Sequence, residues 1–559
     1  MNKLIKMIIS ALLILCLALP LGACGKETAK KELPDFEDTD NITEFEVDWF
    51  VNVSYWKWPG EYGKDYLSDL LQRRTGAKIN FQVSAGDSNT QIMTMIAGGT
   101  LPDIITCSDD IRYKMASGGY LWAYDDLIKK YSPELGEIVK QIPDIYDWYR
   151  EYDQKVYGLP NYASSENYLK KDEKLNPNMA GVIRSDLYNK IGRPDISTPD
   201  AFLDALEQIK NKIGTYRGSE LIPLQLYEFS TDGSPSMNAL RGYFSVPFED
   251  KDGHYIRHCD KEFQIYRFLN KAYNRGLLKI ENFSDSRENI NEKVTSGRVV
   301  SLFAAIQDFG TYMTSLYDSD NQAVYEPIIM KNYDGEDPLL ADTSCYGYQT
   351  TSISTQAKRP DLCTKLITYL MSDQGQLEML FGAQDETQYT INDKGNVVWT
   401  EGGNLWNAYA GGNAEAVKYY TLGFNLLTDY LRTRNYYAEA TDQRSISTQS
   451  FYIQKPLQPY TYNGKRAILK SVPETEKKIN YTKINAKINS YWGTQMVKII
   501  TAPSEEKARQ YYDEGLQKEK EYGGEKLLAY QDECLQASKE MMGWEYAWPR
   551  NQKENTNVD

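Results

Sequence analysis

Histidine is almost missing from this 559-residue chain, which contains only His254 and His258. A serine or cysteine nucleophile of the common hydrolases needs a histidine base within hydrogen-bonding distance. The chain also lacks an HExxH motif, a GxxxxGK[ST] loop and a GxGxxG motif after a predicted strand, which argues against metalloproteases, phosphate-binding loops and dinucleotide folds. Acidic residues are plentiful, 78 in all, so a pair of carboxylates at glycosidase spacing stays open.

The two histidines share the stretch DGHYIRHCD and stand four residues apart. Gly253 and the alternation around Tyr255 predict a hairpin strand rather than a helix, with both histidines exposed. Two histidines alone do not complete a zinc site. The residues DKDG at 250–253 begin like a calcium loop but lack its remaining ligands, so they predict a hairpin turn.

Cysteine spacing gives no sign of a disulfide framework or a zinc site, because the seven cysteines are far apart and form no CxxC pair. Cys16 lies in the N-terminal apolar run, and Cys24 follows that run. The other cysteines are odd in number and are predicted to be buried or half-buried thiols. They are Cys107, Cys259, Cys345, Cys363 and Cys534.

Long apolar runs are confined to one place, residues 7–19, which Lys3 and Lys6 precede. This run is too short for a membrane helix, which needs about 20 residues, but it fits the apolar region of a signal peptide. Residues 1–23 are therefore predicted to be a signal peptide, and the chain behind it a soluble protein apart from its N-terminus.

The predicted signal peptide runs into LGAC, residues 21–24, which resembles the lipobox of bacterial lipoproteins. The resemblance implies that Cys24 carries lipid such as palmitate and becomes the first mature residue. Residues 24–43 are mostly polar and charged and are predicted to form a flexible tether. The alternative, a secreted protein with a chance cysteine at this place, stays open.

Positive charge is in deficit, since 63 basic and 78 acidic residues give a net charge of −15. Such a chain repels polyphosphates, which argues against nucleic acid as a partner. Aromatic rings with a polar group are abundant, with 44 tyrosines and 10 tryptophans. These rings suit a surface that stacks and hydrogen-bonds, although most are expected in or near the core.

Strand and helix patterns alternate from residue 45 onwards. FEVDWFVNVS at 45–54 is typical of a strand, DYLSDLLQRRTG at 65–76 of an amphipathic helix, and AKINFQVSAG at 77–86 of a second strand. A helix over about 88–97 and a short strand at 101–108 follow. This alternation predicts parallel β/α construction, with ligands outside the carboxyl ends of the strands.

A second unit is predicted after residue 162. There Thr198 caps a helix, another helix covers about 261–275, and GRVVSLFAAI at 297–306 is typical of a buried strand. Beyond about residue 360 the chain is mostly helical in character. Residues 551–559 are predicted to be a disordered tail.

Several short motifs, in this order behind a lipobox, resemble the extracellular solute-binding proteins of family 1, the lipoprotein receptors of bacterial ABC sugar importers. The motifs are GGTLPDII at 98–105, KVYGLPN at 155–161, IRSDL at 183–187 with the helix start at Thr198, SGRVV at 296–300 and FG at 381–382.

The resemblance implies a periplasmic-binding-protein-like fold of type II, in which two α/β lobes are joined by a hinge and a ligand cleft lies between them. The N-terminal lobe is predicted over residues 44–160 plus about 325–385, and the C-terminal lobe over 161–324 plus about 386–550. The resemblance also implies a monomer without a cofactor. Lipid holds it at the extracellular face of a Gram-positive cell membrane, and it passes its ligand to the permease of an ABC transporter.

One departure from this family concerns calcium. Its long-chain members often carry an Asp/Asn/Gly-rich calcium loop that ends in Asp-Glu-Ile-Pro, whereas residues 214–224 read GTYRGSELIPL here. Only Glu220 is a candidate ligand in this loop. The sequence therefore predicts no calcium or other metal at this place.

Candidate ligand-binding residues come from predicted strand ends, from the predicted hinge and from aromatic positions later in the chain. Indole and phenol rings stack on sugar rings, and carboxylates accept hydrogen bonds from sugar hydroxyls. For each ring, packing in the core stays an open alternative. The candidates are Ser54, Tyr55, Trp56, Trp58, Asp109, Asp110, Asn161, Tyr162, Gln307, Asp308, Tyr346, Tyr348 and Trp406.

The predicted function is therefore capture of a carbohydrate, in particular an oligosaccharide, for an ABC importer rather than catalysis. Two alternatives stay open from the sequence. One is a secreted glycosidase that uses carboxylates, and the other is a peptide-binding lipoprotein.

Overall fold

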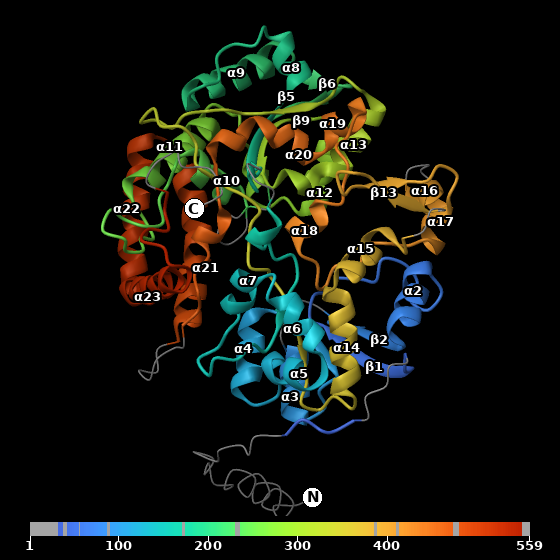
Figure 1. The fold of residues 1–559 in the computed structure, drawn as a ribbon. Helices are drawn as coiled ribbons and strands as arrows, with labels where there is room; N and C mark the ends of the chain where they lie inside the picture. Colours follow the sequence, from blue (N-terminus) through green and yellow to red (C-terminus); the bar gives the residue numbers. More distant parts are fainter. Residues whose placement is uncertain are drawn as a thin grey trace, which may run out of the picture.

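Two β-sheets, each covered by helices, form the two lobes of the protein (Figure 1). The computed structural model describes residues 32–36, 42–54, 56–85, 90–169, 174–227, 229, 235–384, 388–409, 413–472 and 480–549.

The sheet of the first lobe has the strand order β2-β1-β3-β12-β4. The strand β1 (Phe45–Val51) lies between β2 (Ala77–Val83) and β3 (Ile104–Cys107) and runs parallel to both. The strand β12 (Thr350–Ile353) is antiparallel to β3 and to the short β4 (Leu159–Pro160). The first lobe is therefore completed by a strand that lies far along the chain.

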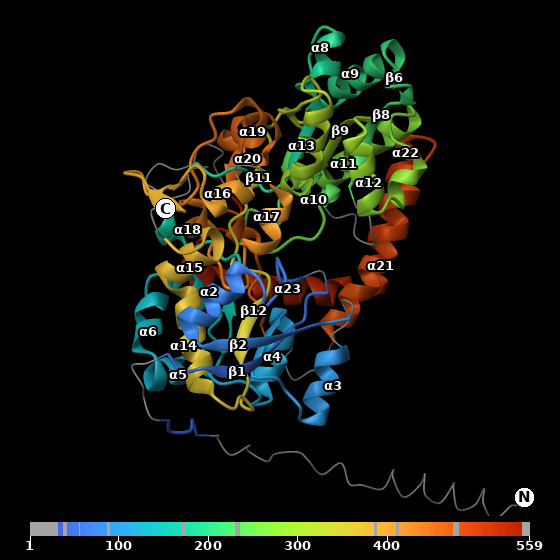
Figure 2. The ribbon, with the colours of Figure 1, turned by 90° about the vertical axis from the view of Figure 1, so that its right-hand side faces the viewer.

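Side chains of β1 alternate between the two faces of this sheet, as expected for a strand. Trp49 packs in a core with Leu67 of α2 (Tyr66–Thr75), and Phe50 packs on the opposite side with Ile111. Figure 2 shows α5, α6 and α14 on one side of the sheet and α3 and α4 on the other. The bounds are α3 Thr90–Gly98, α4 Asp109–Ser117, α5 Tyr124–Tyr131, α6 Pro133–Val139, α7 Pro143–Trp148, α14 Pro360–Met371 and α15 Asp373–Phe381.

The helix α2 confirms the prediction over residues 65–76. The carboxylate of Asp65 accepts a hydrogen bond from the backbone N–H of Ser68, and the helix stops at Gly76, whose φ is 76°. A Cβ at Gly76 would lie 2.1 Å from the carbonyl oxygen of Thr43, so only glycine fits there. The predicted strands at 45–54, 77–86 and 101–108 are confirmed as β1, β2 and β3.

The sheet of the second lobe has the strand order β10-β5-β9-β8. The central β9 (Val299–Ala304) is parallel to β8 (Ile222–Leu226) and antiparallel to β5 (Ala180–Arg184), which also pairs with β10 (Tyr325–Pro327). The strands β5, β8 and β9 are buried on both faces, which is the pattern of a covered sheet.

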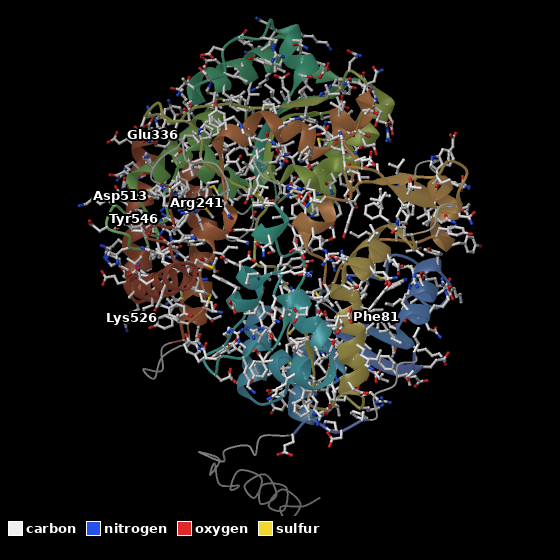
Figure 3. All side chains as sticks on the ribbon, in the orientation of Figure 1. Phe81, Arg241, Glu336, Asp513, Lys526 and Tyr546 are labelled. Carbon is white, nitrogen blue, oxygen red and sulfur yellow. The ribbon has the colours of Figure 1, made fainter. Side chains whose placement is uncertain are left out.

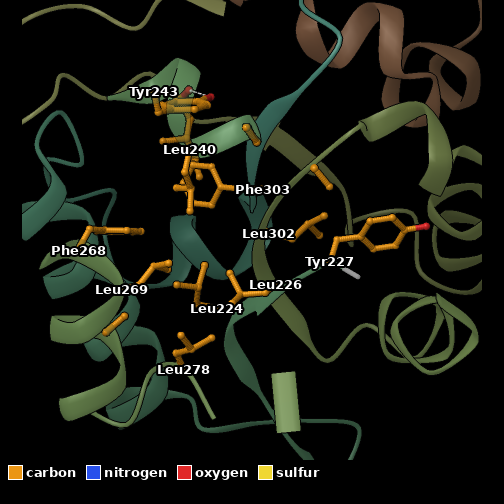
Figure 4. Close-up of a cluster of buried hydrophobic side chains, with 14 of the residues drawn as sticks. Leu224, Leu226, Tyr227, Leu240, Tyr243, Phe268, Leu269, Leu278, Leu302 and Phe303 are labelled. Atoms are coloured by element: carbon orange, nitrogen blue, oxygen red, sulfur yellow. Dashed lines mark hydrogen bonds between the residues drawn. The ribbon is translucent and has the colours of Figure 1, made fainter. Parts of the chain in front are cut away.

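Helices cover this second sheet and share its core (Figure 4). Leu226 of β8 and Leu302 of β9 lie in one buried cluster with Phe268. The predicted helix at 261–275 is confirmed as α11, and the hydroxyl of Thr198 caps α9 by accepting from the backbone N–H of Ala201. The bounds are α8 Ser185–Lys190, α9 Pro199–Lys212, α10 Ser236–Tyr243, α11 Asp260–Asn274, α12 Arg287–Thr295 and α13 Gly310–Ser319.

Three long helices near the C-terminus pack on the second lobe, and the last of them also reaches the first: α21 (Tyr481–Ile500), α22 (Glu505–Glu521) and α23 (Gly524–Met542). Leu527 belongs to the core of the second lobe, and Met542 packs against the core of the first. Figure 1 shows these helices in red along one side of the molecule.

Between α15 and α21 the chain forms short elements at the side and centre of the molecule (Figure 1). Leu405, Phe424 and Leu427 lie in the core of the first lobe, although residues from about 386 are predicted in the second. The bounds are β13 Tyr389–Ile391, β14 Val397–Trp399, α16 Asn404–Tyr409, α17 Ala414–Tyr419, α18 Tyr430–Arg434, α19 Gln443–Thr448, α20 Ser450–Gln454, and the pairs β6 Thr215–Tyr216 with β7 Ser219–Glu220 and β11 Leu340–Ala341 with β15 Thr461–Tyr462.

The hairpin turn predicted at 250–253 is confirmed, because Gly253 has φ 86° and Glu249 forms an antiparallel bridge with Tyr255. The interpretation of both histidines as exposed strand residues is wrong for His258. Its side chain is only 21% exposed, because α22 packs over it and brings the carboxylate of Glu519 within 2.9 Å. The five described cysteines are free and buried or half-buried, as predicted.

The structure describes part of the predicted tether, residues 32–36. The Lys130 ammonium donates a hydrogen bond to the carbonyl oxygen of Leu33, and the Arg359 guanidinium lies over the ring of Phe36. The signal peptide and Cys24 lie outside the described residues. No helix in the described part of the chain is both long enough and apolar enough to cross a membrane.

Candidate functional site

A cavity of about 1240 Å³, called the main cavity below, lies between the two lobes. The helix α18 lines it and is joined to the first lobe, because the guanidinium of Arg432 donates a hydrogen bond of 3.0 Å to the carbonyl oxygen of Met371. The helix α10 also lines it and belongs to the core of the second lobe through Leu240. Tyr162 and the segment 339–345 line it where the chain passes between the lobes. Both lobes therefore contribute side chains to one site.

Two stacked tyrosines mark the hinge side of the main cavity. The rings of Tyr162 and Tyr348 have centroids 6.0 Å apart and an angle of 19° between their planes. Tyr162 adopts a left-handed backbone conformation with φ 49°, and its hydroxyl accepts a hydrogen bond of 2.8 Å from the amide of Asn425. The ring of Tyr348 is 47% exposed, so it offers a large aromatic surface to a ligand.

Neutral amides make up much of the polar lining. Gln307 donates a hydrogen bond of 2.6 Å to the side-chain oxygen of Asn178, and Asn176 donates one of 2.7 Å to the backbone of Phe451. Each of these amides still has a second donor or acceptor position. The cavity also contains Asn238, Gln454 and Asn489.

Asp342 shapes one wall of the main cavity. Its carboxylate accepts hydrogen bonds from the backbone N–H groups of Ser344 and Gly464 and from the hydroxyl of Ser344, at 2.7–2.8 Å. Burial raises the pKa of Asp342 to about 6, although these donors oppose the shift. A Cβ at Gly464 would lie 2.7 Å from the carbonyl oxygen of Asp342, so this residue must be glycine for the wall to close.

A largely buried charge cluster lines part of the main cavity. Arg241 and His258 both contact the carboxylate of Glu262, which also accepts a hydrogen bond of 2.9 Å from the hydroxyl of Tyr512. His258 and Arg257 contact Glu519 at 2.9 and 2.7 Å. Figure 3 shows Arg241 on the side of the molecule where the C-terminal helices lie.

The charges in this cluster compensate one another. Burial alone would raise the pKa of Glu262, but Arg241 and His258 outweigh it and hold this pKa at about 2. Burial would lower the pKa of His258, but the carboxylates of Glu262 and Glu519 raise it to about 9. At neutral pH Glu262 is therefore ionised and His258 protonated, and each has a partner of opposite charge.

This lining suits a neutral polar ligand better than it suits a reaction. The buried acids of the charge cluster are committed to ion pairs, and the open part of the cavity offers amides and aromatic rings. Among the described residues, no group of three histidines, cysteines or acids is placed to hold a metal ion. In the loop at 214–224, Glu220 contacts the ammonium of Lys279 at 2.9 Å.

Four of the predicted site residues line the main cavity: Tyr162, Gln307, Asp308 and Tyr348. Asp308 lies 4.0 Å from the guanidinium of Arg287, and its side chain is exposed. The structure thus brings residues of the hinge and of the second lobe together at one site. Their role as ligand contacts stays a prediction.

Other predicted site residues lie in the core, away from the main cavity. Trp58 is buried, and its indole N–H donates a hydrogen bond of 2.8 Å to Asp65. Tyr346 is buried and stacks on Trp148 at 3.7 Å. Asn161 is buried, and its side-chain oxygen accepts from the backbone N–H of Gln349.

Asp109 and Asp110 begin α4, where their carboxylates lie 2.8 and 3.6 Å from nitrogens of Arg112 and Lys114. Neither lines the main cavity.

Trp56 is half-buried and does not line the main cavity, but it contacts a residue that is bonded to the lining residue Tyr162. Its indole N–H donates to the side-chain oxygen of Asn425, the residue that contacts Tyr162. Ser54 and the half-buried Trp406 lie outside the lining. Tyr55, like Cys24, falls outside the described residues.

The sequence reasoning missed the lining residues that the C-terminal helices and α20 contribute. Trp492 and Trp548 reach the cavity only because their segments fold back over the second lobe. The stretch NPN at 176–178 could have indicated lining residues, because it places two amide side chains shortly before the buried strand β5.

Comparison with known proteins identifies the family. The profile of the bacterial extracellular solute-binding proteins matches residues 67–385. The chain belongs to this family. The predicted resemblance is therefore confirmed.

This solute-binding protein is similar to curated and solved relatives. It is 25% identical over 330 residues to the fructooligosaccharide ABC transporter substrate-binding protein FusA of Streptococcus pneumoniae, a stretch that covers 56% of this chain and 58% of that protein. The match thus spans less than two thirds of the relative's own length.

Two solved structures share the fold. FusA in complex with kestose superimposes with a TM-score of 0.65 at 17% identity, over 89% of this chain and 100% of that one. A human milk oligosaccharide-binding solute-binding protein of Bifidobacterium longum infantis gives 0.64 at 14% identity, over 88% and 98%. The predicted fold, two α/β lobes of the periplasmic-binding type II class, is confirmed. These relatives are named as binding components of transporters and not as enzymes.

Proposed function

We propose that the protein captures an oligosaccharide in the main cavity and delivers it to an ABC importer. The observation that carries this proposal is the stacked pair Tyr162 and Tyr348, which presents a half-exposed ring to a cavity lined with amides. Aromatic faces stack on the C–H faces of sugars, and amides exchange hydrogen bonds with hydroxyl groups. At about 1240 Å³ the cavity exceeds most small-molecule sites, which hold roughly 300–1,000 Å³.

The relatives support a carbohydrate ligand. FusA is named for fructooligosaccharides and has been solved with kestose, and the bifidobacterial protein is named for milk oligosaccharides. The compensated charge cluster of this chain leaves little net charge to attract an ionic ligand. A neutral oligosaccharide is the ligand class that agrees with both observations.

Transport in this proposal depends on closure of the lobes. Because α18 is bonded to the first lobe, α10 belongs to the core of the second, and both line the same cavity, a ligand makes all its contacts only when the lobes are together. Binding therefore shifts the population toward the closed form, which an importer distinguishes from the open one.

The anchor at Cys24 and the monomeric state belong to the proposal as well. The lipid would hold the receptor beside its permease at the outer face of the membrane. A single acyl chain binds membranes only weakly, so the several chains expected on a lipobox cysteine are needed. The predicted lobe boundaries and the site residues on the first-lobe side, such as Trp56, also remain proposals.

Calorimetry with a panel of neutral oligosaccharides that includes kestose tests the proposed function. We expect at least one to bind with a dissociation constant near the micromolar range, which corresponds to about −8 kcal/mol, with no product formed. Replacing Tyr348→Ala should weaken binding about tenfold, or about 1.4 kcal/mol, because it removes the exposed stacking ring. Tyr152→Ala is the matched control, since Tyr152 is exposed but does not line the cavity.

Two results would contradict the proposal. Binding of a peptide together with no binding of any oligosaccharide would make the protein a peptide receptor. Release of shorter sugars from the bound ligand would make it a glycosidase.

A further inference from the structure

A second hollow of about 420 Å³, called the outer hollow below, lies beside the short elements between α15 and α18. Ten residues line it, and none of them is charged. Five of the ten are aromatic: Phe381, Trp399, Tyr409, Tyr436 and Tyr437. Single exposed aromatic residues are common on protein surfaces, but a concave group of this kind marks a binding site.

The rings of the outer hollow are held in fixed positions by a buried one. Phe381 is 3% exposed and contacts Trp399 at 5.9 Å and Tyr437 at 5.0 Å between ring centroids. Trp399 lies nearly parallel to Tyr409, with 11° between the planes and 6.2 Å between the centroids. The exposed rings of Tyr409 and Tyr437 thus form an aromatic surface, called the platform below, which packs on Phe381 and Trp399.

Polar groups of the platform are open to a ligand. The hydroxyl of Tyr409 bonds to the backbone of Leu422, which fixes the orientation of that ring. In the described part of the chain, the indole N–H of Trp399 and the hydroxyl of Tyr437 have ring contacts but no hydrogen-bond partner. Ring faces with free donors at their edges match the alternation of C–H faces and hydroxyls on a sugar.

One short segment of the chain, residues 430–438, lines both the main cavity and the outer hollow. Tyr430 and Arg434 line the main cavity, whereas Tyr436 and Tyr437 line the outer hollow. The amide of Asn425 donates a hydrogen bond of 2.8 Å to the hydroxyl of Tyr162, and Gly423, two residues earlier, lines the outer hollow. The outer hollow therefore lies on the side of the main cavity that Tyr162 marks.

We propose that the outer hollow is an additional subsite for the same ligand, in which Tyr409, Trp399 and Tyr437 stack the sugar units that extend beyond the main cavity. This inference rests on the proposed function. Its consequence is a preference for longer neutral oligosaccharides over trisaccharides. A protein partner fits less well, since a stable interface needs roughly 800 Å² from each side and the hollow is small.

Calorimetry on a chain-length series tests this subsite, with kestose and longer fructans of the same linkage and a milk trisaccharide and its longer homologues as probes. We expect the wild type to bind the longer members of one series about tenfold more tightly than the trisaccharide. Tyr437→Ala should lose most of this gain and leave the affinity for the trisaccharide unchanged. Tyr419→Ala is the matched control, because Tyr419 is 64% exposed on α17 and lines neither cavity.

Fluorine NMR on protein labelled with fluorotryptophan gives a direct readout, with the Trp399 resonance assigned from a Trp399→Phe sample. Long oligosaccharides should shift this resonance and the trisaccharide should not. If long sugars bind but Trp399 does not respond, or if Tyr437→Ala keeps the full gain, the outer subsite is refuted and the proposed function stands. If no probe binds the wild type, both ideas fail.

Discussion

At the scale of single residues, the most informative group is His258. Its ring contacts Glu262 and Glu519, which come from two different helices, so the histidine joins α11 to α22. Arg241 and Arg257 complete the pairs on either side. Such clusters are costly to break, because one partner alone leaves a buried charge unpaired.

This cluster makes stability depend on pH in a definite direction. The two carboxylates raise the pKa of His258 to about 9 against the pull of burial, whereas an unfolded chain holds histidine near about 6.5. Between these values the folded state binds a proton that the unfolded state lacks. The stabilisation is therefore complete below about pH 6.5 and is lost as the pH rises through about 9.

Histidine NMR and urea unfolding at several pH values check this prediction. With only two histidines in the chain, the resonances are assigned from a His254→Gln sample. Glu262→Gln should lower the pKa of His258 and flatten the fall in stability. His254→Gln should change that fall much less, because Asp532 also raises the pKa of His254 but the pair is exposed and screened by solvent. A His258 resonance that titrates near pH 6.5 would contradict the argument.

The candidate site could be predicted only where local sequence decides it. Tyr162 follows a strand-like run at the predicted hinge, and Gln307 follows a buried strand, so their positions were readable from the sequence. Tyr348 was a candidate only because its ring could stack on a sugar. Trp492 gives no such sign, since α21 brings it to the cavity by packing across the second lobe. The sequence around Trp58 and Tyr346 does not distinguish these rings from the ring of Tyr348. Only their burial in the folded protein shows that Trp58 and Tyr346 are core residues, whereas Tyr348 is exposed.

At the scale of elements, helix ends are the features that the sequence predicts best. Gly76 ends α2 and Thr198 begins α9 because caps depend on local geometry. The strand β12 was not predicted, since its four residues join the first sheet by pairing with β3 more than two hundred residues earlier in the chain. Such pairing is set by tertiary structure and leaves no local pattern.

The junction of α14 and α15 gives a prediction at this scale. A Cβ at Gly375 would lie 1.8 Å from the carbonyl oxygen of Tyr369, so Gly375→Ala must push the two helices apart. We expect it to lower the free energy of unfolding by about 1–3 kcal/mol in urea denaturation. Gly310→Ala is the control, because Gly310 is also helical but has open space around it, and it should be neutral or slightly stabilising. Equal stability of the two variants would refute the steric argument.

At the scale of the whole molecule, the lobes, the hinge and the proposed anchor act together. The cavity needs both lobes, whereas the proposed lipid on Cys24 serves only to keep the receptor near its permease. Residues 32–36 contact the first lobe through Lys130, so the chain behind the anchor reaches the body at a defined point.

Cys24→Ala separates these two roles. The variant should appear in the culture medium, while its calorimetric affinity for the oligosaccharide stays within about twofold of the wild type, since Cys24 lies far in sequence from every residue of the cavity. Immunoblots of membrane and medium fractions measure the first outcome. A variant that stays on the membrane would show that the cysteine is not the anchor.

The path of the chain between the lobes has one more consequence. The chain leaves the first sheet after β4, returns from the second sheet at β12, and later contributes α23, which contacts both cores. A protease that cuts the chain at one of these two crossings leaves the other crossing to hold the two lobes together. The halves of a chain cut once between the lobes are therefore expected to stay associated.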